Sequence, residues 1–302
     1  MSDDLDPRSG DSRDRDPSDP RDGQSADPRE VFTRDLDLPR GLEREHVHVH
    51  GEEYRLRGSE VRALATIGAF RVVPADDLRD DGGRTGDVRH GDLERLRSAG
   101  LIQAVAPFDR GDRTVLVSLT ERGRDVLESH RSRGSESGQA FYAGIVKGRE
   151  LSHDAQLHRA YLRVAERLEN DGARIHRVVL DYELKREYQR FLQDGNRGRS
   201  DSDGRPTQSQ AEIREWAREH ELAVVNDHVQ FPDFRIEYEH ADGRHDVEDV
   251  EVTTVHYRGA HAAGKVAAGF TRFRGTASRV GGSGSARGGE PFDPHAAEEL
   301  LK

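Results

Sequence analysis

Apolar residues recur along the first half of the chain at spacings that change from segment to segment. Near-helical spacing predicts a helix within 57–73, for which Ser59 is a suitable N-cap, and a short amphipathic turn at 74–81. The same pattern predicts a third helix that ends at Gly100 and a closing helix capped by Thr120. Between these two helices, "LIQAVAPF" and "TVLVSLT" flank the turn "DRGDR", which is typical of a β-hairpin.

A new pattern follows the Gly- and Ser-containing stretch 132–150, which we expect to be a linker. An apolar stripe predicts a long amphipathic helix over 152–170. A strand is predicted over 174–184, a second helix over 208–222 and a third over 257–274. This part of the chain therefore mixes helices with strands.

Two alternating segments, "PDFRIEY" and "HDVEDVEVT", flank the turn "ADGR" and predict an antiparallel hairpin. Because side chains alternate between the faces of a strand, Asp233 lies at the start of the first strand, while Asp249, Glu251 and Thr253 share one face of the second. Two carboxylates on neighbouring strands can hold Mg²⁺, which could activate water and stabilise charge on a phosphate. The plain alternative is a solvated face of the sheet.

Composition limits the class of protein. Hydrophobic residues make up 33% of the chain and charged residues 35%, which is core material for two small domains rather than one large one. The chain has no cysteine, which excludes disulfides and thiolate metal sites. No apolar run is long enough to cross a membrane, so we expect a cytoplasmic protein without a membrane partner. We expect residues 1–43 to be a disordered tail and 276–302 a flexible end.

The string "LERLRSAGLI", followed by a hairpin and "LTERGRDVL", resembles MarR-like winged-helix regulators. The resemblance implies a winged helix-turn-helix over 44–131, in which the helix ending near Ala99 is the recognition helix and "DRGDR" is the wing. Double-stranded DNA is then the partner, because an arginine can form paired hydrogen bonds with a phosphate or a guanine edge. The candidates for this contact are Arg89, Arg95, Arg97, Arg110 and Arg113. Three acids of the same segment would repel phosphate if they face it, namely Asp87, Asp92 and Glu94.

The order helix, strand, helical insertion, hairpin and helix in 151–275 resembles the core of PD-(D/E)XK nucleases. Asp233 follows a proline and supplies the "PD", and Glu251 stands where the acid of "(D/E)XK" belongs. Thr253 occupies the position of the lysine, but some members of that fold carry the lysine on the following helix, where this chain has Lys265. The resemblance implies that Asp233 and Glu251 bind Mg²⁺ and that Lys265 completes a catalytic site. The first helix of that fold often adds an acid, for which the candidates are Asp154, Glu166 and Glu169.

A winged helix followed by a PD-(D/E)XK-like domain resembles the replication-relaxation family of plasmids and integrated mobile elements, over roughly 55–275. We therefore expect an α+β fold with an N-terminal winged helix-turn-helix and a C-terminal restriction-endonuclease-like domain. The resemblance implies a DNA-binding protein of mobile-element replication or mobilisation, with a Mg²⁺-dependent endonuclease site. Because Thr253 is not a lysine, a second interpretation stays open. It is a non-enzymatic transcriptional regulator whose C-terminal domain is a degenerate nuclease fold that binds a partner or forms a homodimer.

Overall fold

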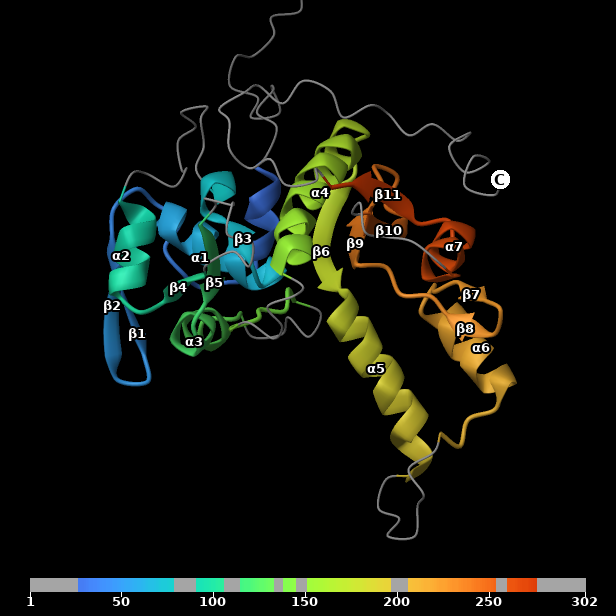
Figure 1. Ribbon diagram of the computed structural model, residues 1–302. Coiled ribbons are helices and arrows are strands. Elements are labelled where there is room, and N and C mark those ends of the chain that lie inside the picture. Colours follow the sequence, from blue (N-terminus) through green and yellow to red (C-terminus); the bar gives the residue numbers. More distant parts are fainter. Residues whose placement is uncertain are drawn as a thin grey trace, which may run out of the picture.

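The described residues of the computed structural model form helices and sheets in two parts that lie side by side (Figure 1), which confirms the α+β class. None of the helices in these residues is both long and apolar enough to span a bilayer. The structure describes residues 27–78, 91–105, 115–132, 138–144, 151–196, 206–253 and 260–275.

From residue 58 onward, the N-terminal part follows the element order that its apolar pattern predicts, with one short strand added after the first helix. Its elements are the strands β1 (Glu45–Val49) and β2 (Glu52–Leu56), helix α1 (Gly58–Phe70), strand β3 (Val73–Pro74), the 3-10 helix η2 (Ala75–Leu78), helix α2 (Asp92–Ser98), strands β4 (Ile102–Val105) and β5 (Leu116–Leu119), and helix α3 (Glu121–Ser129). Strand β5 lies between β3 and β4 and pairs antiparallel with both. The turn "DRGDR" lies outside the described residues.

Local hydrogen bonds explain where these helices begin and end. Helix α3 starts as predicted, because the Thr120 hydroxyl accepts the Gly123 N–H at 3.1 Å. Helix α2 is followed by Gly100 in the left-handed region, with a φ of 70°. The prediction for Ser59 was wrong: α1 already begins at Gly58, and the Ser59 hydroxyl donates instead to Asp92 on α2.

The expected tail does not extend to residue 43. Residues Pro28–Thr33 form a 3-10 helix, η1, whose Phe32 is only 1% exposed. The Phe32 ring packs against Phe70 of α1 and Tyr161 of the C-terminal part, with centroid distances of 5.6 and 5.2 Å. This aromatic cluster offsets the entropy cost of ordering a mostly polar segment.

The C-terminal part is built around a four-stranded sheet with the order β11-β10-β9-β6. Strand β9 pairs antiparallel with β6 and β10, whereas β11 runs parallel to β10. The elements are α4 (Leu151–Asn170), β6 (Arg174–Leu180), α5 (Asp181–Gln193), η4 (Asp194–Asn196), α6 (Gln210–Glu219), β7 (Val224–Val225), β8 (His228–Val229), β9 (Phe234–Glu239), β10 (His245–Thr253), α7 (Ala260–Ala267) and β11 (Thr271–Arg274).

The prediction of a helix over 257–274 was wrong at the C-terminal end of that range. Helix α7 stops at Ala267, and Gly269 takes a φ of 78° that L side chains avoid. The residues that follow form β11, whose Phe273 pairs with Val252 of β10. A parallel edge strand is thus added to the predicted hairpin.

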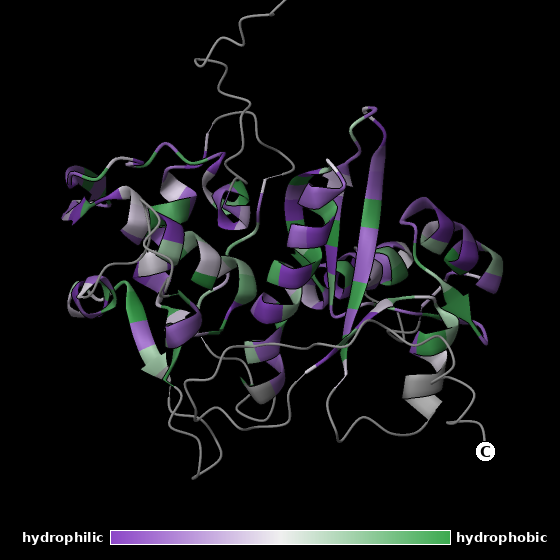
Figure 2. Ribbon diagram, turned by 90° about the horizontal axis from the view of Figure 1, so that it is seen from above, coloured by the Kyte–Doolittle hydropathy of each residue, from purple (hydrophilic) through white to green (hydrophobic). Residues whose placement is uncertain are grey.

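Helix α4 joins the two parts into one hydrophobic core. It contacts β6 and β10 of the large sheet and β3 of the N-terminal sheet. The segment expected to be a linker is also packed where it is described, since Phe141 is buried and the Gln139 side chain bonds to the N–H and C=O of Val178, both at 2.9 Å. Figure 2 shows hydrophobic and hydrophilic residues alternating along helices and strands of both parts, as expected for elements with one buried face.

Candidate functional site

Asp233, Glu251 and Lys265 come together at one end of the large sheet. The Lys265 Nζ lies 2.6 Å from Glu251 Oε2 and 3.5 Å from Asp233 Oδ1. The exposed fractions of the side chains are 2% for Glu251, 13% for Asp233 and 18% for Lys265. Two acids predicted from the strands and a lysine predicted from the next helix therefore meet at a single, largely buried point.

The strand register places the two acids next to each other. Phe234 pairs with Val250, and the Asp233 N–H donates to the Val250 C=O at 3.0 Å, which continues the ladder toward Glu251. Alternation puts Asp249 on the same face as Glu251, where it binds Arg235 at 2.7 and 2.9 Å. The crossover from β10 through α7 to β11 then brings Lys265 to this face.

Asp233 is held by a residue that the sequence analysis did not select. His153, near the start of α4, places its Nε2 3.0 Å from Asp233 Oδ2. The Val252 N–H donates to the same oxygen at 2.7 Å. One signal was present in the sequence, because His153 precedes the buried Leu157 by four residues and so lies on the face of α4 that meets the sheet.

Charges in the site reinforce one another. Burial alone would raise the pKa of Asp233, but the hydrogen bond and charge of His153, together with Lys265 and the Val252 N–H, hold it below its usual range. Burial alone would lower the pKa of His153, but Asp154 and Asp233 raise it to about 10. At neutral pH, Asp233 is therefore a carboxylate and His153 an imidazolium.

The acids fit a hard cation. Carboxylate oxygens are the ligands that Mg²⁺ prefers, and Asp233 Oδ1 and Glu251 Oε2 already point at one positive group, the Lys265 ammonium. Among the acids proposed for the first helix, only Asp154 is nearby, 3.6 Å from His153. Glu166 and Glu169 lie more than three turns further along α4, roughly 20 Å away.

Thr253 does not take the part of a lysine. It follows Glu251 by two residues on β10, and its hydroxyl donates to the Phe273 C=O of β11 at 3.3 Å. A neutral hydroxyl engaged with the backbone supplies no positive charge to a phosphate. Of Thr253 and Lys265, therefore, it is Lys265 that brings positive charge to the two acids.

Of the five arginines proposed to contact DNA, Arg95 and Arg97 lie on α2, and the side chain of each is 57% exposed. Arg97 pairs with Glu94 at 2.8 Å, while Arg95 approaches the buried Glu60 at 3.6 Å. Asp92 is buried and faces α1, so it does not oppose a phosphate at the surface. The other candidates fall outside the described residues, namely Arg89, Arg110 and Arg113, together with Asp87.

The site thus combines two carboxylates, a lysine and a charged histidine, which come from helices α4 and α7, from strand β10 and from the residue before β9. No protein-family model matches this chain, and no curated protein or solved structure is significantly similar to it.

Proposed function

We propose that this chain is a DNA-binding protein that cleaves DNA phosphodiester bonds at the site formed by Asp233, Glu251 and Lys265. The observation that carries the proposal is the position of Lys265, whose Nζ lies 2.6 Å from Glu251 and 3.5 Å from Asp233. Lys265 lies on α7, and its ammonium supplies the positive charge that Thr253 lacks. A solvated sheet face gives no reason for these groups to be buried together.

The order of elements supports the same proposal. Helix α4, strand β6, a helical insertion, the β9–β10 hairpin and α7 follow the order that a PD-(D/E)XK resemblance implies. The three-stranded sheet of β3, β5 and β4, with α2 before its hairpin and α3 after it, supports a winged helix for binding double-stranded DNA. Both features are consistent with a role in mobile-element replication or mobilisation.

Each side chain has a distinct task in the proposed reaction. Asp233 and Glu251 would hold Mg²⁺, which when bound activates water and stabilises charge on the phosphate. Lys265 donates a hydrogen bond to the attacked phosphate oxygens, where negative charge increases. His153 is a positioning residue, because its Nε2 lies 3.0 Å from Asp233 Oδ2, the oxygen that also accepts the Val252 N–H.

Incubation with supercoiled plasmid in Mg²⁺, in Mn²⁺ and in EDTA tests the proposal. The wild-type chain should nick the plasmid in Mg²⁺ and in Mn²⁺ but not in EDTA. Asp233→Asn or Glu251→Gln should lower the nicking rate by about 100-fold or more. Asp242→Asn changes an exposed acid of the hairpin turn and should leave the rate unchanged. Nicking that continues in EDTA or in both site variants would disprove the proposal.

A second candidate function rests on Thr253 and on the Lys265–Glu251 ion pair, which could serve only to hold α7 on the sheet. The chain would then be a transcriptional regulator, with its C-terminal part used for partner binding or a homodimer. Salt-sensitive binding to a labelled duplex without nicking, by a species of dimer mass in light scattering, would favour this candidate. Nicking by a monomer would exclude it.

A further inference from the structure

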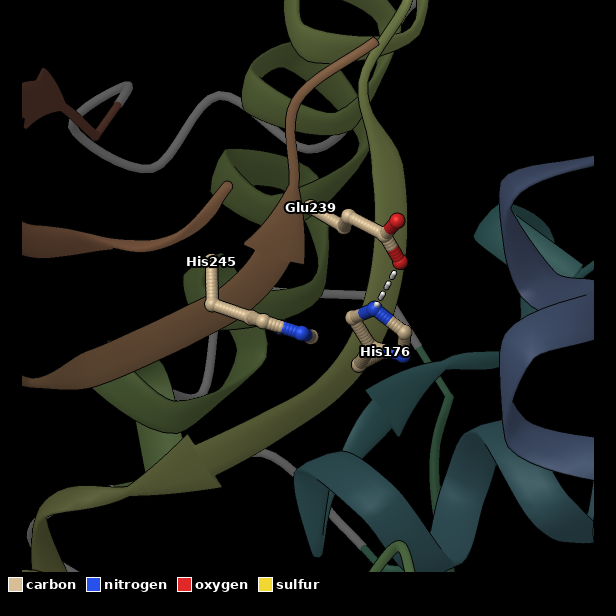
Figure 3. A group of neighbouring side chains, drawn as sticks. All are labelled: His176, Glu239 and His245. Atoms are coloured by element: carbon tan, nitrogen blue, oxygen red, sulfur yellow. Dashed lines mark hydrogen bonds and ion pairs between the residues drawn. The ribbon is translucent and has the colours of Figure 1, made fainter. Parts of the chain in front are cut away.

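A second group of ligand-type side chains lies at the opposite end of the same sheet. His176 comes from β6, Glu239 from β9 and His245 from β10, and Figure 3 shows the three side chains meeting in front of the strands. One ligand atom of each residue lies within 4.8 Å of the other two. Asp233 precedes Glu239 by six residues of extended chain, so this group is roughly 20 Å from the proposed cleavage site.

The backbone is arranged to bring these side chains together. Glu239 and His245 are direct partners across the β9–β10 ladder, which makes their side chains neighbours on one face. On the other side, the ladder between β6 and β9 shifts register between Ile175 and Arg177, and His176 is the extra residue. A bulge of this kind redirects a side chain, and here it directs His176 toward Glu239.

We propose that His176, Glu239 and His245 bind a divalent transition-metal ion of the zinc class. Imidazole nitrogens suit Zn²⁺ and its neighbours in the first transition row, unlike the all-oxygen set that suits Mg²⁺. Two histidines and a glutamate are a common three-ligand set for zinc, with the fourth position left to water. The ion would join β6, β9 and β10 where the hairpin turns.

The distances agree with this ligand set. Two ligands of a tetrahedral zinc ion are about 3.4 Å apart when each bond is about 2.1 Å. His176 Nε2 and Glu239 Oε2 are already 3.3 Å apart. His245 is exposed, so its ring can approach an ion between them without disturbing the core.

A hydrogen-bonded His176–Glu239 pair would not by itself explain the second histidine. The His245 ring lies with its centroid 5.4 Å from that of His176, at an angle of 37° that is not parallel stacking. His176 and His245 also line a hollow of about 490 Å³, beside Arg177 and Arg235, which gives an ion access from solvent. Three ligand groups of the right chemistry, open to solvent, favour an ion over a simple pair.

The chain contains a natural control cluster on another hairpin. His46 and His48 of β1 lie beside Glu53 of β2, with His48 Nε2 at 3.7 Å from the carboxylate, and all three side chains are more than half exposed. The residue types are the same as in the proposed site. Within the described residues no third strand pairs with this hairpin to fix a ligand, so we expect it to bind an ion weakly.

Ion binding by the full-length chain without a histidine tag tests the proposal. After dialysis against a chelator, the chain is titrated with Co²⁺, whose visible absorption reports its ligands, and with Zn²⁺ in a calorimeter. We expect one Zn²⁺ ion per chain at this site, and a loss of affinity of at least about ten-fold in His176→Ala, Glu239→Gln and His245→Ala. We expect Zn²⁺ to raise the thermal unfolding temperature of the wild type and not of these variants.

Two control variants separate this site from the others. His48→Ala and the pair Asp233→Asn/Glu251→Gln should keep the strong visible Co²⁺ absorption of the wild type, because that absorption reports the histidine ligands and not an all-oxygen site. The proposal would be overturned if either control lost the Co²⁺ absorption while His245→Ala kept it. A wild-type chain that binds no ion would also overturn it. Should His176→Ala fail to fold, the exposed His245→Ala still decides the result, and neither titration depends on DNA cleavage.

Discussion

At the scale of single residues, Arg97 offers the most direct test of DNA contact. Its guanidinium lies on the last turn of α2 and pairs with the exposed Glu94. We expect Arg97→Ala to weaken binding to a labelled duplex and to reduce the slope of log K against log salt by about 1, because one phosphate contact is lost. Fluorescence anisotropy at several salt concentrations measures both quantities.

Arg124 of α3 is the matched control for this substitution. It forms an ion pair of the same spacing, with Glu121, but on a different helix. Arg124→Ala should leave the salt slope unchanged. Equal slopes for the wild type and Arg97→Ala would show that α2 does not contact the phosphates through this residue.

The residues of the candidate site differ in how far the sequence could predict them. Asp233 and Glu251 follow from alternation and from one turn, because pairing across a hairpin is local. Lys265 could be selected only through the resemblance to PD-(D/E)XK nucleases, and only the structure places its Nζ beside both acids. His153 was missed because its contact with Asp233 spans 80 positions and depends on how α4 packs on the sheet.

At the scale of elements, Asp92 fixes α2 against the rest of the N-terminal part. It is buried at the first position of the helix and accepts hydrogen bonds from Arg57 and Ser59. We expect Asp92→Ala to lower the free energy of unfolding by about 3–5 kcal/mol, because it leaves the buried Arg57 without this carboxylate. Urea unfolding measures the loss.

The neighbouring Glu94 provides the comparison. It is exposed on the same helix, so Glu94→Ala should change the free energy of unfolding by less than about 0.5 kcal/mol. Similar effects of the two substitutions would mean that Asp92 is not the anchor of α2.

The sequence predicted the elements well where one periodicity holds and poorly where it changes. The β9–β10 hairpin and α4 each keep a single period, and both were predicted. Helix α7 and β11 were merged into one helix, because only Ala268, Gly269 and Phe270 separate two short elements. The bulge at His176 gives no pattern in a single sequence, so the second cluster could not be foreseen.

At the scale of the whole molecule, His158 reports on the junction between the two parts. It is fully buried on α4, with its ring 5.3 Å from that of Phe70 on α1. Burial, with smaller contributions from Arg29 and Arg159, lowers its pKa from 6.5 to about 3. Between these values the unfolded chain takes up a proton that the folded chain does not, so stability falls as the pH falls.

Replacing this histidine should reduce the acid sensitivity of the fold. When the pH falls from 7.5 to 5.5, His158 lowers the free energy of unfolding of the wild type by about 1.4 kcal/mol. Over the same interval, the free energy of unfolding of His158→Leu should fall by about 1.4 kcal/mol less than that of the wild type. Urea unfolding of both chains at the two pH values measures the difference. The same pH dependence in both chains would show that His158 is protonated in the folded state.

The sequence predicted the order of the two parts but not that they share a core. Two small domains and a linker followed from low hydrophobic content and from local composition. Phe32 and Phe141 instead fill the space around α1 and α4, and such long-range packing leaves no local signal. The boundaries at residues 43 and 132 therefore cut through packed structure.

In the proposed reaction, Lys265 does the work of the lysine that is absent at position 253. The most direct measurement is the single-turnover nicking rate of supercoiled plasmid in Mg²⁺, compared between the wild type and Lys265→Met, which keeps the unbranched side chain and removes the charge. With thermal unfolding confirming that the variant folds, we predict a rate lower by about 100-fold or more. A variant that nicks as fast as the wild type, or a wild type that binds DNA and never nicks it, would contradict the claim.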